Sequence, residues 1–546
     1  MSRSIPPTQN ARHDGRAAPP WPAAALAERP WLAAGLLGLV TLAVFLPVVR
    51  CGFVNWDDGP YVFRNPLVLD GLSAAGVRRA CTEVVFGNWS PLTILSYQLD
   101  VALFGRDPWG FHLTNAILHA ASTALLYLVL VRMTGAPGRS GFATLLFAVH
   151  PLRVESVAWI AERKDVASVL FLMLALVAYE RHCRAPSPGR LAAVAAAMLA
   201  SLLCKPTLVT LPVLLLLLDV WPLGRIELPG VGRPTRPDGP SPYPVRPWRL
   251  VLAEKLPLLG LSLLFVAITL RVQSAAILEE DAMPLVAERI PNAIHAVNWY
   301  VWKTFWPTGL CPFHRTVGGD LPLAVLGGCA ASLVFAGAVA WKLARTRPFV
   351  AWGLLWFLVS LLPVLGLVQT GLQGAGDRFS YVPHVGLLVA VVWAAADLAA
   401  RLRPPRGAVA VAAAAVVLLL TVLTLRRIPM WTDSETLWTT TLREDPGNFL
   451  AHLKFANHLV AARRLREAEP HYRAAAAGAS DDWTGRVCRM TSLANLACLY
   501  YDLGDLENAR KIRQLAIDLD PDDVAVRRMA DHVRIPEAAA GAAGPP

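Results

Sequence analysis

The sequence is poor in charged residues. Asp, Glu, Lys and Arg make up 17% of its 546 residues and hydrophobic residues make up 55%, whereas soluble proteins carry about 25% charged residues. This shortage excludes an ordinary soluble globular protein. It predicts a polytopic membrane protein with a smaller soluble part.

The motifs of several enzyme classes are absent. The sequence has no GxxxxGK[ST] loop, no GxGxxG, no HExxH and no Ser-His-Asp spacing, which argues against an ATP-driven pump and a soluble-type protease. None of its eight cysteines forms a CxxC pair, so the pattern predicts neither a zinc site nor a redox pair. No broken-helix inverted repeat stands out, which disfavours a secondary transporter.

The net charge of +11 is spread without a basic patch interleaved with aromatic residues. We therefore expect no nucleic-acid partner. In a membrane protein, excess Lys and Arg mark the cytoplasmic loops.

Apolar runs near twenty residues, several of them shorter, recur along the first 427 residues, and we interpret them as membrane spans. Basic loops between them place the N-terminus in the cytoplasm and residues beyond 427 on the outer face, if 273–321 makes no net crossing. The pattern thus predicts a multi-pass protein of a bacterial inner membrane. The eleven predicted spans are 31–50, 111–132, 141–160, 166–181, 190–204, 206–221, 254–272, 322–343, 349–369, 381–400 and 407–426.

The C-terminal part has the pattern of helical repeats. Residues 448–477 and 491–523 each read as a helix pair, and 433–448 is a partial copy. In the second copy Ala497, Gly504 and Pro521, among others, follow the tetratricopeptide pattern. Such a short α-solenoid is typical of a protein-interaction platform, and holding an acceptor polypeptide over the membrane is the alternative.

The predicted fold is therefore all-α, in four parts. These are a disordered cytoplasmic N-terminus (1–30), a transmembrane domain (31–427) with outer loops 51–110, 273–321 and 370–380, a tetratricopeptide-repeat domain (428–525) and a disordered tail (526–546).

Adjacent carboxylates, Asp57 and Asp58, follow the first predicted span in GFVNWDDGPYVF (52–63). The DDGP letters are also typical of a plain turn. However, adjacent carboxylates in a partly desolvated place repel each other, and one of them can then serve as a general base.

The stretch HPLRVESVAWIAERKD (150–165) carries the most ionisable residues near the lipid. If it is one helix, Glu155 and Glu162, seven residues apart, share a face. Charged groups at this depth are costly and usually functional, so a phosphate grip and an internal ion-pair network both remain open. The candidates for binding a phosphorylated donor are His150, Arg153, Glu155, Glu162, Arg163 and Lys164.

The loop GLQGAGDRFSYVPHVG (371–386) adds Arg378 as a phosphate clamp, with Tyr381 at the start of the next span. A pair between Arg378 and an acid such as Asp377 is the alternative. Lys205, at a helix boundary, is assigned to snorkelling.

These stretches, with PLTILSYQLD (91–100), GFHLTNAILH (110–119) and the C-terminal repeats, occur in an order that resembles a known family. The chain is similar to bacterial relatives of the transmembrane and tetratricopeptide-repeat-containing O-mannosyltransferases, which look like type C glycosyltransferases. The resemblance covers about residues 31–525.

The resemblance implies transfer of a sugar, such as mannose, from a polyprenyl-phosphate donor to a hydroxyl of a protein or glycan acceptor on the outer face. It implies Asp57 as the base and Asp58 as its partner. It leaves metal dependence open: a divalent Mg or Mn ion would use Asp57, Asp58 and Glu155. A non-catalytic scaffold that presents the repeats, and a transporter of a lipid-linked sugar, are the alternatives.

Overall fold

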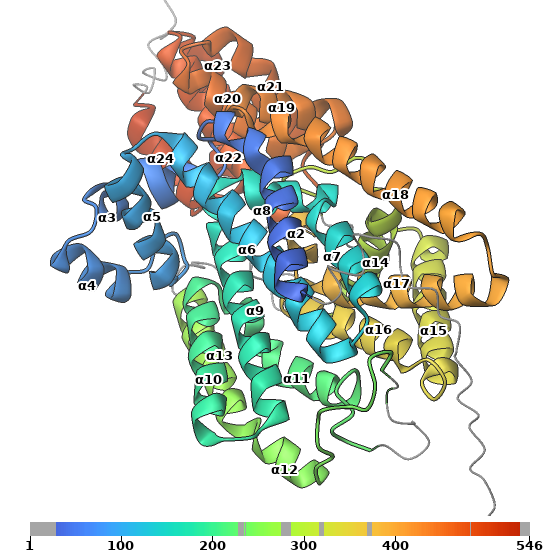
Figure 1. Ribbon diagram of the computed structural model, residues 1–546. Helices are drawn as coiled ribbons and strands as arrows, with labels where there is room; N and C mark the ends of the chain where they lie inside the picture. Colours follow the sequence, from blue (N-terminus) through green and yellow to red (C-terminus); the bar gives the residue numbers. More distant parts are fainter. Residues whose placement is uncertain are drawn as a thin grey trace, which may run out of the picture.

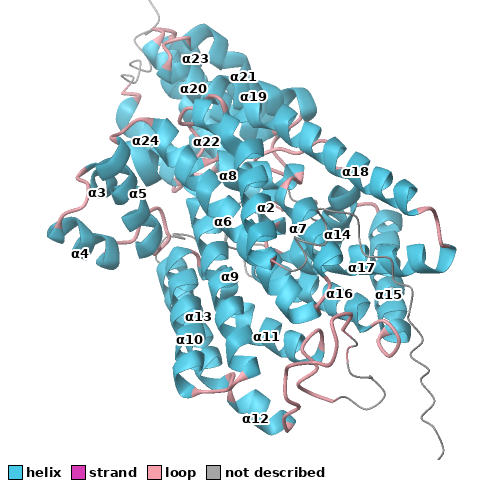
Figure 2. Cartoon of the chain, viewed as in Figure 1, coloured by secondary structure: helices cyan, strands magenta, loops and turns pink. Residues whose placement is uncertain are grey.

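The computed structural model describes residues 29–227, 234, 236–274, 286–315, 321–367, 374–480 and 482–534. Within these residues every named element is a helix, and pairing of extended backbone is limited to isolated bridges (Figure 2). The predicted all-α class is confirmed. The predicted disordered ends fall almost wholly outside the described residues, although the last helix, α24 (Val524–His532), extends past the boundary expected at 525.

The described residues hold seven helices that are long and apolar enough to cross a membrane, not eleven. Three further predicted spans, 190–204, 206–221 and 349–369, correspond to shorter apolar helices. The seven are Pro30–Arg50 (α2, Pro30–Phe45, with a 3-10 turn), α6 (Pro108–Thr134), Ile160–Arg184 (α9, Arg163–Arg184), Trp248–Val272 (α12, Trp248–Ala253, and most of α13, Leu256–Ser274), α15 (Leu323–Leu343), α17 (Pro383–Leu402) and Arg406–Trp431 (α18, Arg406–Arg427).

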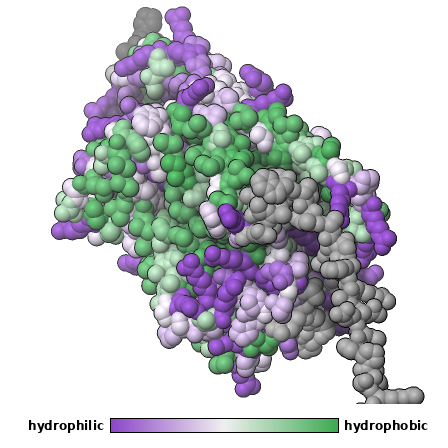
Figure 3. Space-filling model, viewed as in Figure 1, coloured by the Kyte–Doolittle hydropathy of each residue, from purple (hydrophilic) through white to green (hydrophobic). Residues whose placement is uncertain are grey.

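The shorter apolar helices complete the bundle. They are α5 (Pro91–Phe104), α10 (Pro188–Cys204), α11 (Leu211–Val220, after the turn Pro206–Thr210) and α16 (Pro348–Leu361). In Figure 3 a hydrophobic band crosses the visible face between hydrophilic ends, as expected of a protein that spans a bilayer. The segment predicted to make no net crossing contains α14 (Val286–Phe305), which is not among the candidate spans.

The predicted span 141–160 is wrong because the chain breaks twice within it. Helix α7 (Pro137–Ala148) ends early, and Pro151 starts a 3-10 turn in which the His150 ring accepts a hydrogen bond from the Leu152 amide. Helix α8 (Val154–Ala158) is one turn long, because Trp159 has extended backbone angles. Glu155 and Glu162 therefore do not share a helix face.

The C-terminal helices gather at one end of the bundle, opposite α12 (Figure 1). They are α19 (Ser434–Glu444), α20 (Phe449–Ala461), α21 (Leu465–Gly478), α22 (Trp483–Asp502), α23 (Leu506–Leu519) and α24. Five of their N-termini are capped by side chains, which satisfies backbone amides that would otherwise lack partners; the capping residues are Asp433, Asn448, Asp482, Asp505 and Asp523. The tetratricopeptide assignment stays a prediction.

The packing of α16 against α17 depends on glycine. A Cβ atom on Gly386 of α17 would lie 2.6 Å from the Gly353 carbonyl oxygen of α16, and one on Gly353 would lie 2.4 Å from the Gly386 oxygen. Both contacts are with backbone, which cannot move aside without separating the helices. These two glycines therefore set the spacing that places the loop before α17.

We expect Gly386→Val to destabilise the folded protein by about 1–3 kcal/mol, because the added methyl groups force the two backbones apart. Thermal unfolding in detergent measures the loss. Gly328→Val in α15 is the matched control, since a Cβ there meets nothing within 4 Å. Equal melting temperatures for the two variants would contradict this account of the helix spacing.

Candidate active site

Asp58 is a buried structural carboxylate. It is 1% exposed, and its two oxygens accept hydrogen bonds from the backbone amides of Val54 and Ala161, each at 2.9 Å. Burial raises the pKa of Asp58 to about 7, although the two amide hydrogen bonds oppose the shift. Asp58 thus joins the first outer loop to the turn that follows Trp159.

Asp57 is left facing a cavity of about 760 Å³. Its side chain is half-buried, and in the described part of the chain its carboxylate makes no hydrogen bond or ion pair. The two neighbouring acids therefore have different environments: Asp58 is hydrogen-bonded to backbone amides, and Asp57 is available to a ligand. The assignment of Asp57 as the base stays a prediction.

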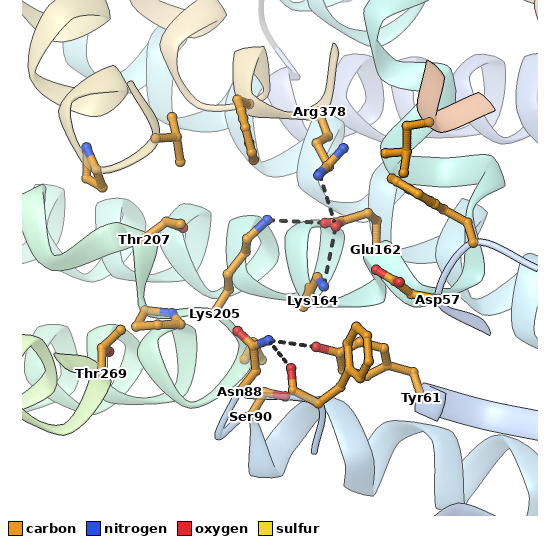
Figure 4. Close-up of a pocket in the computed structure, with 18 of the residues that line it drawn as sticks. Asp57, Tyr61, Asn88, Ser90, Glu162, Lys164, Lys205, Thr207, Thr269 and Arg378 are labelled. Atoms are coloured by element: carbon orange, nitrogen blue, oxygen red, sulfur yellow. Dashed lines mark hydrogen bonds and ion pairs between the residues drawn. The ribbon is translucent and has the colours of Figure 1, made fainter. Parts of the chain in front are cut away.

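Three cations converge on Glu162 at the same cavity (Figure 4). Its carboxylate lies 3.4 Å from the Lys164 ammonium, 3.1 Å from the Lys205 ammonium and 3.2 Å from Arg378 Nε. The cations come from α9, from the end of α10 and from the loop before α17. All three share the Glu162 carboxylate.

Two further acids hold the cluster in place. Glu155 accepts hydrogen bonds from the Arg378 guanidinium at 2.5 Å and from its backbone amide at 2.8 Å, and Asp165 pairs with Lys205 at 2.6 Å. Lys164 has no second carboxylate within ion-pair distance among the described residues. Its ammonium instead lies 4.6 Å from the centre of the Tyr61 ring.

The cavity lies between the membrane helices and the C-terminal helices. Its membrane side is mainly apolar, and its opposite side is built by α20 and α22. The membrane side includes Val266, Thr269 and Leu270 of α13 with Leu362, Pro363 and Val364 after α16; the opposite side includes Leu450, Leu453, Lys454, Asn457, Val487, Cys488 and Thr491.

Six predicted site residues do not line this cavity: Asp58 and Glu155, described above, and Arg163, His150, Arg153 and Tyr381. Arg163 is fully buried and bound by Asp100 at 2.6 Å and by the Phe111 carbonyl at 2.7 Å, so its charge is used within the fold. His150, Arg153 and Tyr381 belong to a buried polar cluster behind the cavity. In this cluster Arg153 donates to the Ser380 hydroxyl at 2.5 Å, His150 contacts the Thr304 carbonyl at 3.1 Å, and the Tyr381 hydroxyl bonds with His119.

The residues considered for a metal do not fit one. Both oxygens of Asp58 already accept backbone amides, and Glu155 is paired with Arg378. Across the described ranges, no group of three His, Cys, Asp or Glu side chains is arranged to hold an ion. We therefore derive no step through a metal.

Sequence reasoning missed two cavity residues. Lys205 was assigned to snorkelling, but it points at Glu162 and Asp165. Lys454 lies in a predicted repeat helix, where a single lysine gives no sign of a site. The dipeptide Lys205-Pro206 was the sequence feature that could have indicated this role, because the proline ends the apolar helix directly at a charged residue.

We expect Asp58→Asn to lower stability by about 1–3 kcal/mol, because the new amide group must face a backbone N–H that it cannot satisfy. Thermal unfolding of the purified protein in detergent measures the change. Asp70→Asn is the control: Asp70 is in the same loop but 61% exposed, with a single ion pair at 3.6 Å to Arg79. Matching stability of the two variants would show that Asp58 does not hold the loop.

Comparison with known proteins finds similarity to mannosyltransferases. Residues 90–226 match the sequence model of the family described as dolichyl-phosphate-mannose-protein mannosyltransferase. The chain is also similar to protein O-mannosyl-transferase Tmtc1 of Drosophila melanogaster, at 38% identity over 35% of this chain and 23% of that protein. Two mouse (Mus musculus) proteins match over 71% of this chain: protein O-mannosyl-transferase TMTC1, at 25% identity over 51% of its length, and TMTC4, at 24% over 57%.

No solved structure matches the chain. The matched regions span between about a quarter and just over half of these relatives. Glu155, Glu162, Lys164 and Lys205 all fall inside 90–226, so most of the cation cluster belongs to the matched region. The comparisons thus relate residues 90–226 to the dolichyl-phosphate-mannose-protein mannosyltransferase family, and the chain more weakly to the protein O-mannosyl-transferases.

Proposed function

We propose that the protein is a type C membrane glycosyltransferase. It would move a hexose such as mannose from a polyprenyl-phosphate donor to a hydroxyl of a protein or glycan acceptor. The observation that carries the proposal is a single cavity that holds both a free carboxylate, Asp57, and three cations gathered around Glu162. Its position between apolar helices and a hydrophilic end of the molecule suits a donor with a lipid tail.

The donor phosphate would bind at the cation cluster. Lys164, Lys205 and Arg378 present donors from three elements, and phosphate oxygens accept such charge-assisted hydrogen bonds well. Glu162 keeps the cations close together before the donor arrives. The polyprenyl chain would lie against the apolar wall formed by α13 and the residues after α16.

The transfer itself needs one proton acceptor. Asp57 would take the proton from the acceptor hydroxyl while the hydroxyl oxygen attacks the anomeric carbon of the sugar. The bond between that carbon and the phosphate oxygen breaks, and its electron pair leaves with polyprenyl phosphate. The cations stabilise the negative charge that develops on this leaving group. The products are the glycoside, polyprenyl phosphate and protonated Asp57.

We place this chemistry on the outer face of a bacterial inner membrane, with the N-terminus in the cytoplasm. The basic loops of the sequence support this orientation. The C-terminal helices, which form the cavity wall opposite the lipid, would then lie where secreted acceptors pass. A scaffold without catalysis is the main competing function.

We expect Asp57→Asn to abolish transfer, a loss of at least about a hundredfold, because the amide cannot accept the proton. The measurement compares, by mass spectrometry, membrane and secreted glycoconjugates from cells that lack the gene and cells that express the native or variant chain. Asp70→Asn, in the same outer loop and 61% exposed, controls for the substitution. If Asp57→Asn restores every hexose-sized product that the native chain restores, the scaffold function replaces the transferase.

We expect Lys164→Met to raise the KM for polyprenyl-phosphate mannose by about tenfold or more, because one charge-assisted hydrogen bond to phosphate is lost. Initial rates in membranes at varied donor concentration give KM and kcat separately. Lys342→Met, at the exposed end of α15, is the matched control. An unchanged KM would remove Lys164 from the phosphate site.

A further inference from the structure

Two charged side chains in the cavity have no ion-pair partner. The charged residues that line it are Asp57, Glu162, Lys164, Lys205, Arg378 and Lys454. Glu162 pairs with three of the cations. Within the described residues, Asp57 and Lys454 form no ion pair, and the cavity therefore contains one uncommitted anion and one uncommitted cation.

Lys454 lines the same cavity as Asp57 and contacts the aromatic ring of the residue before it. Its ammonium lies 4.8 Å from the centre of the Trp56 ring, the residue that precedes Asp57. That ring packs against Trp438, with centroids 5.4 Å apart, and against Trp159, at 5.9 Å. A cation over an indole face is attracted to it, so the lysine side chain is directed to this end of the cavity.

The loop that carries Asp57 is also fixed to the C-terminal helices through Asn55. The Asn55 amide group donates to the Lys454 carbonyl at 2.9 Å, and its oxygen accepts from the Trp438 indole N–H at 2.5 Å. The Asn55 backbone amide donates to the Ser434 hydroxyl at 2.9 Å. Helices α19 and α20 therefore hold the loop through Asn55, and α20, which forms part of this contact, also carries Lys454.

We propose that Lys454 is a positioning residue for Asp57: its ammonium keeps the carboxylate ionised and directed into the cavity, so that helix α20 completes the reaction site. The inference rests on the proposed function, in which Asp57 is the base. It assigns to the C-terminal helices a part in the chemistry, beyond presenting a surface to partners.

The other groups near Asp57 do not supply this effect. Asp58 adds negative charge from the same loop, and Tyr61 is neutral because burial raises the pKa of its hydroxyl. Lys164 faces Asp57 from α9, but Glu162 lies 3.4 Å from its ammonium and offsets it. Among the cations that line the cavity, Lys454 is the one that forms no ion pair with a carboxylate of the described residues.

The surroundings of Lys454 agree with this role. Burial lowers the pKa of the Lys454 ammonium, and the Asp57 carboxylate partly offsets that shift. The titratable group on the neighbouring helix, Cys488, stays neutral because burial raises the pKa of its thiol to about 12. Asp57 is thus the carboxylate that favours the charged form of Lys454.

The test is the pH dependence of transfer. Membranes that contain equal amounts of the native chain, Lys454→Arg, Lys454→Met or Lys511→Met are given radiolabelled polyprenyl-phosphate mannose and the membrane and secreted protein fraction of cells lacking the gene. Lys511→Met is the matched control, because Lys511 is on α23, 66% exposed and paired with Glu507. Initial rates are measured over the pH range in which the membranes stay intact.

We expect the acid limb of the pH–rate profile of Lys454→Met to move up by about one pH unit, since a neighbouring positive charge favours the ionised carboxylate by at least that much. Lys454→Arg and Lys511→Met should keep the native profile, and the KM for the donor should not change in any variant. A purely structural role would lower the rate equally at every pH.

Each remaining result overturns the inference in a distinct way. A Lys454→Met profile with an unmoved acid limb removes Lys454 from any action on Asp57, and if the KM for the acceptor fraction rises at the same time, the lysine binds acceptor. Asp57→Asn is run alongside. If that variant or the unmodified deletion strain transfers as the native chain does, the proposed function itself fails, and the inference fails with it.

Discussion

The buried hydrogen bonds of Asp58 are the interaction on which the rest of the site depends. A carboxylate that is 1% exposed is tolerated only because two backbone amides, those of Val54 and Ala161, satisfy its oxygens. These bonds join the first outer loop to the turn before α9. Glu162 ends that turn, and Lys164 lies in the first turn of α9. The same bonds fix the backbone next to Asp57, so the position of its carboxylate relative to the cation cluster is fixed as well.

The broken segment between α7 and α9 explains why the acids converge. In a continuous helix, seven residues would separate Glu155 and Glu162 by about 10 Å along the axis. The 3-10 turn at Pro151 precedes α8, and the extended backbone at Trp159 ends α8 after one turn. Both acids can then reach Arg378 from different elements. The irregular backbone is buried inside protein, where its polar groups find partners away from lipid.

The sequence predicted the class of fold and the chemical character of the site better than its geometry. Apolar runs located most membrane helices, because hydropathy is a property of local composition. The pairing of Arg378 with Glu155 and the use of Arg163 by Asp100 could not be read from the sequence, because each joins residues far apart in the chain. Asp57 and Asp58 are adjacent and chemically identical, and only the position of two backbone amides distinguishes them.

The cavity wall made by α20 and α22 bears on how such a transfer could avoid hydrolysing its donor. A sugar held on phosphate beside a general base reacts with water unless water is excluded. The membrane helices cover one side of the cavity with apolar residues, and the C-terminal helices cover the other. Because Asn55 anchors the base-bearing loop to α19 and α20, closing the cavity and positioning Asp57 depend on the same contact. Removal of the C-terminal helices would therefore expose the site to water and release its base together, which makes them part of the catalytic unit in the proposed function.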